Sequence, residues 1–535
     1  MQLVSYSFGL FLFALVLMYY IVPGRFQWIL LLAASLAFYS CGGIFFLIFP
    51  IVTSISVWFL AGRIADNKLK AAQYVKEHSL GKDEKKAYNK REKLVRRRFM
   101  IIGLVLNFGI LAVIKYGDFI LGNISAFLTF AGSALFADAG SGLYFNPLGL
   151  VLPLGISYYT FQTASYLIDV YHGKITHERN LPRFILFATF FPQMIAGPIS
   201  RYTDLKDQLY AEHHFDPERI RYGLMRILWG YFKKLVIADR MSAAVLTITG
   251  GPDTYRGIYV LFGMVGYTIW MYADFAGGID IVLGVAELFG IQLPENFNRP
   301  FFSKSLAEFW RRWHMTLMSW LREYIFFPVS TSHFTLGLMK RIDKLFGKAA
   351  ANRVPVYIAT ITVWLTAGIW HGASWKFVAW GMANCVVMLI SQELQPLYRL
   401  FHKHVNVEGS FAFSCFRVAR TFMLFAVLEM FEYYPFMTVF SMFGSLLTES
   451  SLSQLSLEQF EMLGLGSADI VILIIGVLIL LLVSLSERKQ DVRKTICGLH
   501  FIPQYLLVAG LFIFVLIAGI YGYGFDASAF VYNQF

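Results

Sequence analysis

Residues 26–62 read FQWILLLAASLAFYSCGGIFFLIFPIVTSISVWFLAG and contain no charged side chain. A helix needs about 20 mainly apolar residues to cross the hydrocarbon core of a bilayer, so this stretch is long enough for two crossings. The sequence Cys41-Gly42-Gly43 divides it into two predicted hydrophobic helices, because neighbouring glycines interrupt a helix. Residues 1–24 are also uncharged and show neither a basic start nor a small-residue cleavage site. We therefore interpret them as a retained membrane span rather than a signal peptide.

The composition of the whole chain extends this pattern. Of the 535 residues, 57% are apolar and 15% are charged, whereas an average soluble protein has about 45–50% apolar and about 25% charged residues. A soluble core cannot bury so much apolar surface, so lipid must be the solvent for much of it. This excludes a soluble enzyme, a disordered chain, a fibrous repeat and a disulfide-stapled secreted domain. No metal-ligand spacing occurs among the cysteines, which are Cys41, Cys385, Cys415 and Cys497.

The distribution of basic residues predicts which segments of the chain face the cytoplasm. Residues 63–98 hold thirteen Lys and Arg against five Asp and Glu, a balance of +8 within a net charge of +12. Cytoplasmic loops of membrane proteins are rich in Lys and Arg, so we predict a cytoplasmic loop here. Residues 298–353 and the turn at 486–489 are predicted to be cytoplasmic for the same reason, which places both chain ends outside. Nucleic acid is not an expected partner, because no aromatic platform alternates with the basic residues.

Further apolar runs follow, and several are short or interrupted by Gly and Pro, which is typical of half-spans and re-entrant segments. We predict an all-α polytopic membrane protein with about 10–12 transmembrane helices plus short re-entrant and interfacial helices. Three parts are expected: N-terminal transmembrane helices with the basic loop (1–98), a core (99–395) and C-terminal transmembrane helices (396–535). The runs lie at 99–114, 119–137, 144–168, 184–199, 257–273, 281–293, 355–370, 377–392, 421–446, 470–486 and 501–525.

The first of two notable histidines, His314, lies in the sequence FWRRWHMTL. We place this sequence on a helix over 306–325. At 100° per residue, Trp310, Trp313 and His314 fall on its apolar half, with the neighbouring arginines opposite. A basic amphipathic helix with tryptophans is typically interfacial. His314 is then either a core histidine satisfied by one hydrogen bond or a site residue, and helix geometry leaves both open.

The second, His371, lies in the sequence GIWHGASW between two charge-free apolar runs. An ionisable side chain at such a place is costly, which makes it a candidate for function. Gly368 and Gly372 leave room for a substrate near the backbone, and an imidazole can accept a proton from a hydroxyl near neutral pH. The alternative is a loop histidine at the membrane interface.

The sequence contains few other features that indicate a catalytic activity. The chain contains no GxxxxGK[ST], HExxH or GxSxG motif, so ATP hydrolysis, zinc proteolysis and the hydrolase nucleophile elbow are not expected. Carboxylates within apolar context are either proton-relay groups or structural acids with satisfied charges, and we favour the structural interpretation for each. They are Asp274, Asp280, Glu287, Glu429 and Glu432.

Four motifs, in this order, resemble the membrane-bound O-acyltransferase (MBOAT) family, and most nearly its alginate O-acetyltransferase branch. They are FFPQMIAGPI (190–199), PENFNRP (294–300), FWRRWH (309–314) and GIWHGASW (368–375). The resemblance runs from about residue 100 to 395. It implies helices that enclose a central funnel and makes residues 99–395 the catalytic core. It also implies that His371 is the general base and that His314 is a second essential group near the donor.

The resemblance implies transfer of an acyl group, expected to be acetyl, from a cytoplasmic thioester to hydroxyls of an extracytoplasmic polysaccharide or cell-wall polymer. The expected donor is acetyl-coenzyme A or an acyl carrier protein, with no bound cofactor or metal. We expect a multi-pass protein of the bacterial inner membrane, with membrane lipid and an extracytoplasmic acetyltransferase as further partners. The residues expected to bind substrate are Trp310, Trp313, Trp370, Ser374, Trp375 and Asn296.

Three alternatives stay open. Within the same class, the chain could transfer D-alanine to teichoic acid. Its many spans, intramembrane acids and broken helices also fit a transporter, although no internal repeat is visible. A third alternative is a non-catalytic scaffold that recruits another transferase.

The topology makes a testable prediction. A cysteine introduced at Ser79, in a chain whose native cysteines are replaced by serine, should not react with an impermeant thiol reagent added to intact cells, because the +8 balance of residues 63–98 holds this segment in the cytoplasm. The same reagent should label it after lysis. Efficient labelling in intact cells would overturn the orientation.

Overall fold

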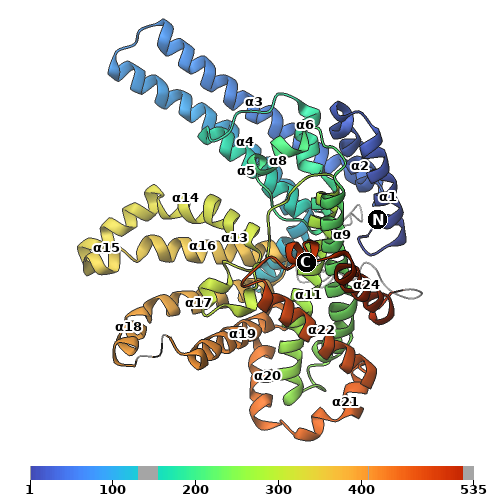
Figure 1. Cartoon of the computed structure of the whole chain (residues 1–535). Helices are drawn as coiled ribbons and strands as arrows, with labels where there is room; N and C mark the ends of the chain where they lie inside the picture. The colour runs from blue at the N-terminus through green and yellow to red at the C-terminus, as the bar shows by residue number, and fades with distance from the viewer. Residues whose placement is uncertain (1, 131–152, 154, 406, 408, 522–535) are drawn as a thin grey trace. The chain divides into compact units, whose positions relative to one another are not determined.

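The computed structural model describes residues 2–130, 153, 155–405, 407 and 409–521 (Figure 1). These residues form helices and no strand, which confirms the predicted all-α polytopic class. The ends of three predicted apolar runs, 119–137, 144–168 and 501–525, lie outside the described residues. The same is true of the predicted outside location of the C-terminus.

Seven helices in the described part of the chain are long and apolar enough to cross a membrane. The number is eight if the bent pair α17 (Trp375–Glu393) and α18 (Gln395–His404) forms one span. Both numbers are below the predicted 10–12. Part of the difference comes from apolar helices that are too short, such as α1 (Tyr6–Ile21) and α20 (Phe436–Thr448). The 16 residues of α1 reach only about 24 Å, against a hydrocarbon core of about 30 Å.

The chain divides into two compact units, each described here by itself. The first comprises residues 1–220 with 285–294, and the second comprises residues 221–284 with 295–535. The division predicted from sequence, after residues 98 and 395, stays a prediction.

A long helical hairpin dominates the first unit. Its two helices are α3 (Ile48–Glu77) and α4 (Lys82–Phe130), drawn in blue in Figure 1. The prediction that residues 63–98 form a loop is therefore wrong, because most of this segment is helical and forms the end of the hairpin where α3 turns into α4. Lys, Arg and Glu are good helix formers, and Asn67 on α3 donates a hydrogen bond to Glu92 on α4 at 2.6 Å.

The same hairpin explains why two predicted runs, 99–114 and 119–137, are not separate helices. Lys115 and Asp118 interrupt the hydropathy but not the helix, since α4 continues through both. Its 49 residues extend about 74 Å, far more than the hydrocarbon core requires. The basic end of α4 therefore extends well beyond one membrane face.

Shorter helices complete the first unit. The predicted run 184–199 is divided in two because Pro192 stands at the start of α7 and Phe190 leaves the helical conformation before it. The remaining elements are η1 (Gly24–Phe26), α2 (Gln27–Ser40), η2 (Ile44–Leu47), α5 (Ile156–His172), α6 (Leu181–Thr189), α7 (Phe191–Ala196) and α8 (Tyr202–Leu209).

In the second unit, α11 (Ile258–Leu288) joins the predicted runs 257–273 and 281–293 into one helix, most of which belongs to this unit. Two of its carboxylates, Asp274 and Asp280, are paired with buried cations. Lys234, on the π-helix η4 (Phe232–Ala238), contacts Asp274 at 2.5 Å and Asp239 at 2.8 Å. Since a buried charge needs a partner, these pairs let α11 continue through acidic positions.

Arg226 extends this charge network. It lies on α9 (Pro217–Tyr231) and donates to Asp280 of α11 at 2.9 Å. Its other nitrogens hold the Glu295 carboxylate at 2.7 and 2.5 Å, and Lys233 also pairs with Asp280. These contacts favour the structural interpretation of Asp280 and fix the loop that contains Glu295.

The other described elements of the second unit are helices of 3 to 23 residues. They are α10 (Asp239–Gly250), η5 (Pro300–Phe302), α12 (Leu306–Phe309), α13 (Met315–Leu321), η6 (Arg322–Phe326), α14 (Phe327–Ser330), α15 (His333–Ala351), α16 (Val354–His371), α19 (Phe411–Tyr433), η7 (Leu452–Leu455), α21 (Leu457–Met462), α22 (Ser467–Ser486), α23 (Val492–Cys497) and α24 (Phe501–Ala518).

The buried charges predict a large stability effect. Lys234→Met would leave Asp274 and Asp239, which are buried, without their cation, at a cost of about 3–5 kcal/mol. We expect a clearly lower thermal unfolding midpoint in detergent. The matched control is Arg256→Met, whose ion pair with Glu449 is more exposed and is expected to contribute less than about 1 kcal/mol. Equal midpoints for the two variants would refute the structural role of Lys234.

Candidate functional site

Close packing of two helices positions His371, the last residue of α16. A Cβ added at Gly381 of α17 would lie 2.4 Å from the backbone oxygen of Trp364 on α16. A Cβ at Gly368 would lie 2.4 Å from the backbone oxygen of Phe377. Small residues at these two crossings allow the backbones to approach, which fixes the end of α16 and His371 with it.

The second histidine occupies an unusual backbone position. The predicted continuous helix over 306–325 is wrong at its centre, because α12 ends at Phe309 and α13 begins only after His314. His314 has φ 44° and ψ 49°, in the left-handed region that costs a non-glycine residue roughly 1–2 kcal/mol. Such conformations persist where the surroundings hold them, often at functional sites.

A neighbouring loop holds this break open. The Asn296 side-chain oxygen accepts hydrogen bonds from the Thr316 N–H at 3.2 Å and the Thr316 hydroxyl at 2.8 Å. The Asn296 backbone oxygen accepts from the Met315 N–H at 2.9 Å. The loop thus supplies acceptors that the preceding helical turn would otherwise provide. Helical periodicity cannot show this, because the partner lies outside the helix.

The Asn296 side chain also determines which ring nitrogen of His314 carries the proton. His314 Nδ1 lies 3.2 Å from Asn296 Oδ1. The Thr316 N–H also reaches Asn296 Oδ1 and can only donate, so Oδ1 acts as an acceptor. His314 Nδ1 is therefore the donor in its contact with Oδ1, and it carries the proton. Nε2 then holds a lone pair. Burial, together with the nearby His371, lowers the pKa of His314 well below its usual value, so the ring is neutral at pH 7.

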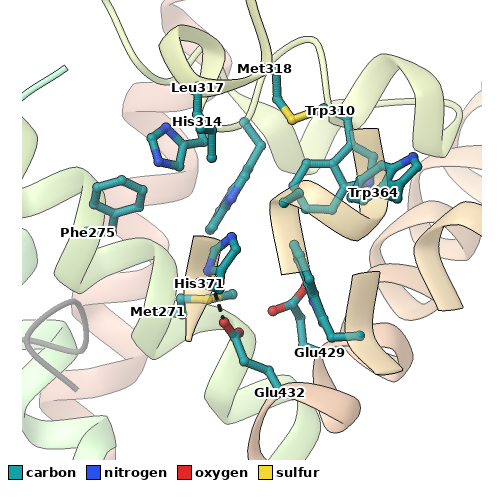
Figure 2. A pocket seen from close by; sticks show the side chains of 13 residues that line it. Met271, Phe275, Trp310, His314, Leu317, Met318, Trp364, His371, Glu429 and Glu432 are labelled. Atoms are coloured by element: carbon teal, nitrogen blue, oxygen red, sulfur yellow. Dashed lines mark hydrogen bonds and ion pairs between the residues drawn. The ribbon is translucent and has the colours of Figure 1, made fainter. Parts of the chain in front are cut away.

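Both histidines line one cavity in the second unit (Figure 2). Aromatic and apolar side chains form most of its wall, which keeps bulk water from the polar groups inside. Two carboxylates from α19, Glu429 and Glu432, complete the lining. The other lining residues are Met271, Phe275, Trp310, Trp313, Leu317, Met318, Trp364, Ala367 and Trp380.

Hydrogen bonds fix the tryptophans of this wall. Trp310 donates its indole N–H to the Asn384 side-chain oxygen at 3.2 Å, and Trp380 donates to Glu429 at 3.0 Å. Trp310 also packs edge-to-face on Trp364 and Trp380, with ring centroids 4.9 and 5.7 Å apart. These contacts satisfy the buried N–H groups and make the wall rigid.

The two histidines have different polar neighbours. His314 is backed by the neutral amide of Asn296, while His371 Nδ1 lies 3.5 Å from the Glu432 carboxylate. An amide oxygen holds an N–H, but a carboxylate also stabilises a positive charge on the ring. Of the two, His371 is therefore better placed to accept a proton.

Only some of the residues predicted to bind substrate line the cavity. Trp310 and Trp313 line the cavity. Trp370 contacts both histidines, with its ring centroid 5.8 Å from that of His314 and 5.2 Å from that of His371. Asn296 lies behind His314. The cavity lining includes neither Ser374 nor Trp375, and the Trp375 side chain is 64% exposed.

The sequence motifs around the two histidines do not include Glu429 and Glu432. They stand three positions apart inside an apolar helix, which puts both on one face. That spacing is the signal that could have found them. Their distance along the chain from both histidines gave no indication of a contact.

Comparison with known proteins shows what the chain is similar to. Residues 175–340 match the family model described as MBOAT, membrane-bound O-acyltransferase family. A probable alginate O-acetylase of Azotobacter vinelandii is 31% identical over 71% of this chain and 66% of its own length. A peptidoglycan O-acetyltransferase of Helicobacter pylori is 29% identical over 57% of this chain and 58% of its own length.

The chain is also similar to a protein named for D-alanyl transfer, the alternative function within the same class. A teichoic acid D-alanyltransferase of Bacillus subtilis is 31% identical, but over only 45% of this chain and 59% of its own length. Four matches to alginate-type relatives span 65–68% of the relative's length, with 67–68% for two from Pseudomonas at 30–31% identity. Another spans 43% of the relative's length. Residues 175–340, which match the family model, include the motifs at 190–199, 294–300 and 309–314.

The loop contacts of Asn296 yield a stability prediction. Asn296→Ala removes the acceptor of the hydrogen bonds to Thr316 and His314. Leaving such buried donors unsatisfied costs about 1–3 kcal/mol, so the thermal unfolding midpoint should fall. The control is Asn298→Ala in the same loop, whose side chain is exposed and whose loss should cost less than about 0.5 kcal/mol. Indistinguishable midpoints would contradict the role of Asn296.

Proposed function

The chain belongs to the membrane-bound O-acyltransferase family, and on that basis we propose that it transfers an acetyl group from a cytoplasmic thioester to hydroxyls of an extracytoplasmic polysaccharide. Family membership supports the predicted class of enzyme, a membrane O-acyltransferase. The observation that carries the finer proposal is the pair His314 and His371 in one aromatic-walled cavity. Only one of the two is backed by a carboxylate.

The proposed reaction begins with the acceptor hydroxyl, a poor nucleophile at neutral pH. His371 Nε2 removes its proton as the oxygen attacks the thioester carbonyl carbon, which contributes about 10²–10⁴ in rate. The tetrahedral intermediate collapses with cleavage of the carbon–sulfur bond. The leaving thiolate then takes the proton from His371, which returns the ring to its neutral state. No resident cofactor or metal enters this sequence.

In this scheme His314 has a different task. Its Nδ1 proton is directed at Asn296, so Nε2 can only accept a hydrogen bond. A neutral acceptor at this position suits an amide N–H of the thioester donor or the acceptor hydroxyl itself. His314 thus orients a reactant while His371 moves the proton.

The surroundings of the site support an anionic donor. Residues 298–353 carry ten Lys and Arg against three acids, and such a field raises the local concentration of an anion. Acetyl-coenzyme A and an acyl carrier protein both fit this charge. We place this segment and the α3–α4 tip on the cytoplasmic side of a bacterial inner membrane.

The acceptor proposal follows the relatives. Those with the greatest coverage are named for alginate, and another is named for peptidoglycan, so an extracytoplasmic polysaccharide or cell-wall polymer is the proposed acceptor. A separate extracytoplasmic acetyltransferase is a further proposed partner. D-alanyl transfer to teichoic acid stays the second candidate, since that relative matches a smaller part of the chain.

Mass analysis of surface polymers from cells with and without the chain distinguishes these functions. Loss of ester-linked acetyl groups in the deletion strain supports the proposal, and loss of D-alanine esters supports the second candidate. Unchanged polymers would argue for a transporter. A non-catalytic scaffold would also remove acetyl groups on deletion, so a point variant is needed to separate it from an enzyme.

That variant is His371→Gln, which keeps most of the side-chain volume but cannot take a proton. We expect acetyl transfer to fall by about 10²–10⁴ in a protein that still inserts and folds. The control is Arg311→Ala, whose side chain is exposed three positions before His314, and which should retain most activity. Near-normal transfer by His371→Gln would mean that His371 is not the base, and it would favour the scaffold.

A further inference from the structure

We propose that Glu432 is the positioning residue for His371: its carboxylate fixes the Nδ1–H of the ring and stabilises the imidazolium that forms during acyl transfer. This inference rests on the proposed function, because it assigns a partner to the proposed base. It also changes the interpretation of Glu432, which the sequence alone favoured as a purely structural acid.

The geometry brings the two groups together from separate helices. Glu432 Oε1 on α19 lies 3.5 Å from His371 Nδ1 at the end of α16, as the dashed line in Figure 2 marks. The Glu432 side chain is 1% exposed and that of His371 is 12% exposed. A buried carboxylate needs a donor or a cation. Catalytic hydrogen bonds are often long without substrate and shorten when it binds, so this distance suits an unliganded site.

A tyrosine orients the carboxylate. The Tyr267 hydroxyl on α11 donates to the other oxygen, Glu432 Oε2, at 3.1 Å, and this contact is buried. One carboxylate oxygen is therefore held by Tyr267, and the other is directed at His371. This division is what a positioning role requires, since rotation of the carboxylate would lose both contacts.

The contact determines which ring nitrogen reacts. In this proposal Glu432 is ionised, and an ionised carboxylate only accepts hydrogen bonds, so the His371 nitrogen beside it, Nδ1, carries the proton. Nε2 then holds the lone pair that can take the hydroxyl proton. During the reaction this proton moves from the hydroxyl to Nε2 and on to the leaving sulfur. Glu432 keeps its charge throughout and stabilises the intermediate imidazolium.

Other charged or titratable groups lie near this pair. Glu429 lies one turn earlier on α19, accepts from the Trp380 indole and shares a side-chain hydrogen bond with Glu432. Lys376, half-buried near the start of α17, acts electrostatically on Glu432. His314 faces His371 across the cavity and is held by Asn296. Among these groups, Glu432 alone has an ion-pair contact with His371 in the part of the chain that the structure describes.

The test compares Glu432→Gln with Glu429→Gln, a matched change of the other α19 carboxylate in the cavity lining. The first readout does not need acyl transfer. Diethyl pyrocarbonate modifies neutral imidazole, and mass spectrometry measures its reaction with His371 at each pH in the full chain. Loss of a stabilising negative charge favours the neutral ring, so the pH of half-maximal modification should fall by about one unit or more in Glu432→Gln. In Glu429→Gln it should move much less.

The second readout is transfer of radiolabelled acetyl from acetyl-coenzyme A into polymer in native membranes. Glu432→Gln should lower the maximal rate about 10²-fold or more, and the acid limb of the pH–rate profile should move to lower pH. A merely structural change would lower the rate without moving that limb. Glu432→Asp keeps the charge but shortens the side chain, so its limb should move in the same direction by less.

The outcomes separate the two proposals. If wild-type membranes transfer no acetyl, the proposed function fails, whereas the modification readout still tests Glu432. An unchanged modification midpoint in Glu432→Gln, or a shift equal to that in Glu429→Gln, overturns the positioning role. If Glu432→Gln does not fold, Glu432→Asp decides: wild-type values in both readouts would refute the proposal.

Discussion

The pairing of buried charge orders the second unit, since a charged or polar group far from water must meet a partner inside the protein. Arg226 joins Asp280 on α11 to Glu295 in the loop that follows α11. The next residue in that loop, Asn296, holds the backbone break at His314. A charge network that first looks structural therefore continues directly into the support of the site.

The same constraint distinguishes the two histidines. Each needs a partner for one ring nitrogen, and the partners have different chemistry. Asn296 gives His314 a neutral acceptor, which suits the proposed task of orienting a reactant. Glu432 gives His371 a carboxylate, so that ring can bear a transient positive charge. An acyl transfer needs one group of each kind: one to hold a reactant and one to move a proton.

The sequence predicted those features that depend on local composition. Lipid as solvent, the helical class and the family followed from hydropathy and the motifs around His314 and His371. Features that depend on distant partners did not follow. The left-handed backbone at His314 is held by Asn296 from another loop, and α11 continues through Asp274 because Lys234 neutralises it. Hydropathy divides a helix at each charge, even where the folded chain supplies a partner for that charge and the helix continues.

We propose that acyl transfer takes place in the cavity that His314 and His371 line. A cryo-electron microscopy structure of the full chain with a thioether analogue of acetyl-coenzyme A tests this proposal. We expect the acyl carbon to enter this cavity and to leave room for a hydroxyl oxygen about 3–3.5 Å from it, within hydrogen-bond reach of His371 Nε2. An analogue bound outside the cavity, or an acyl carbon that no hydroxyl held by His371 can reach, would contradict it.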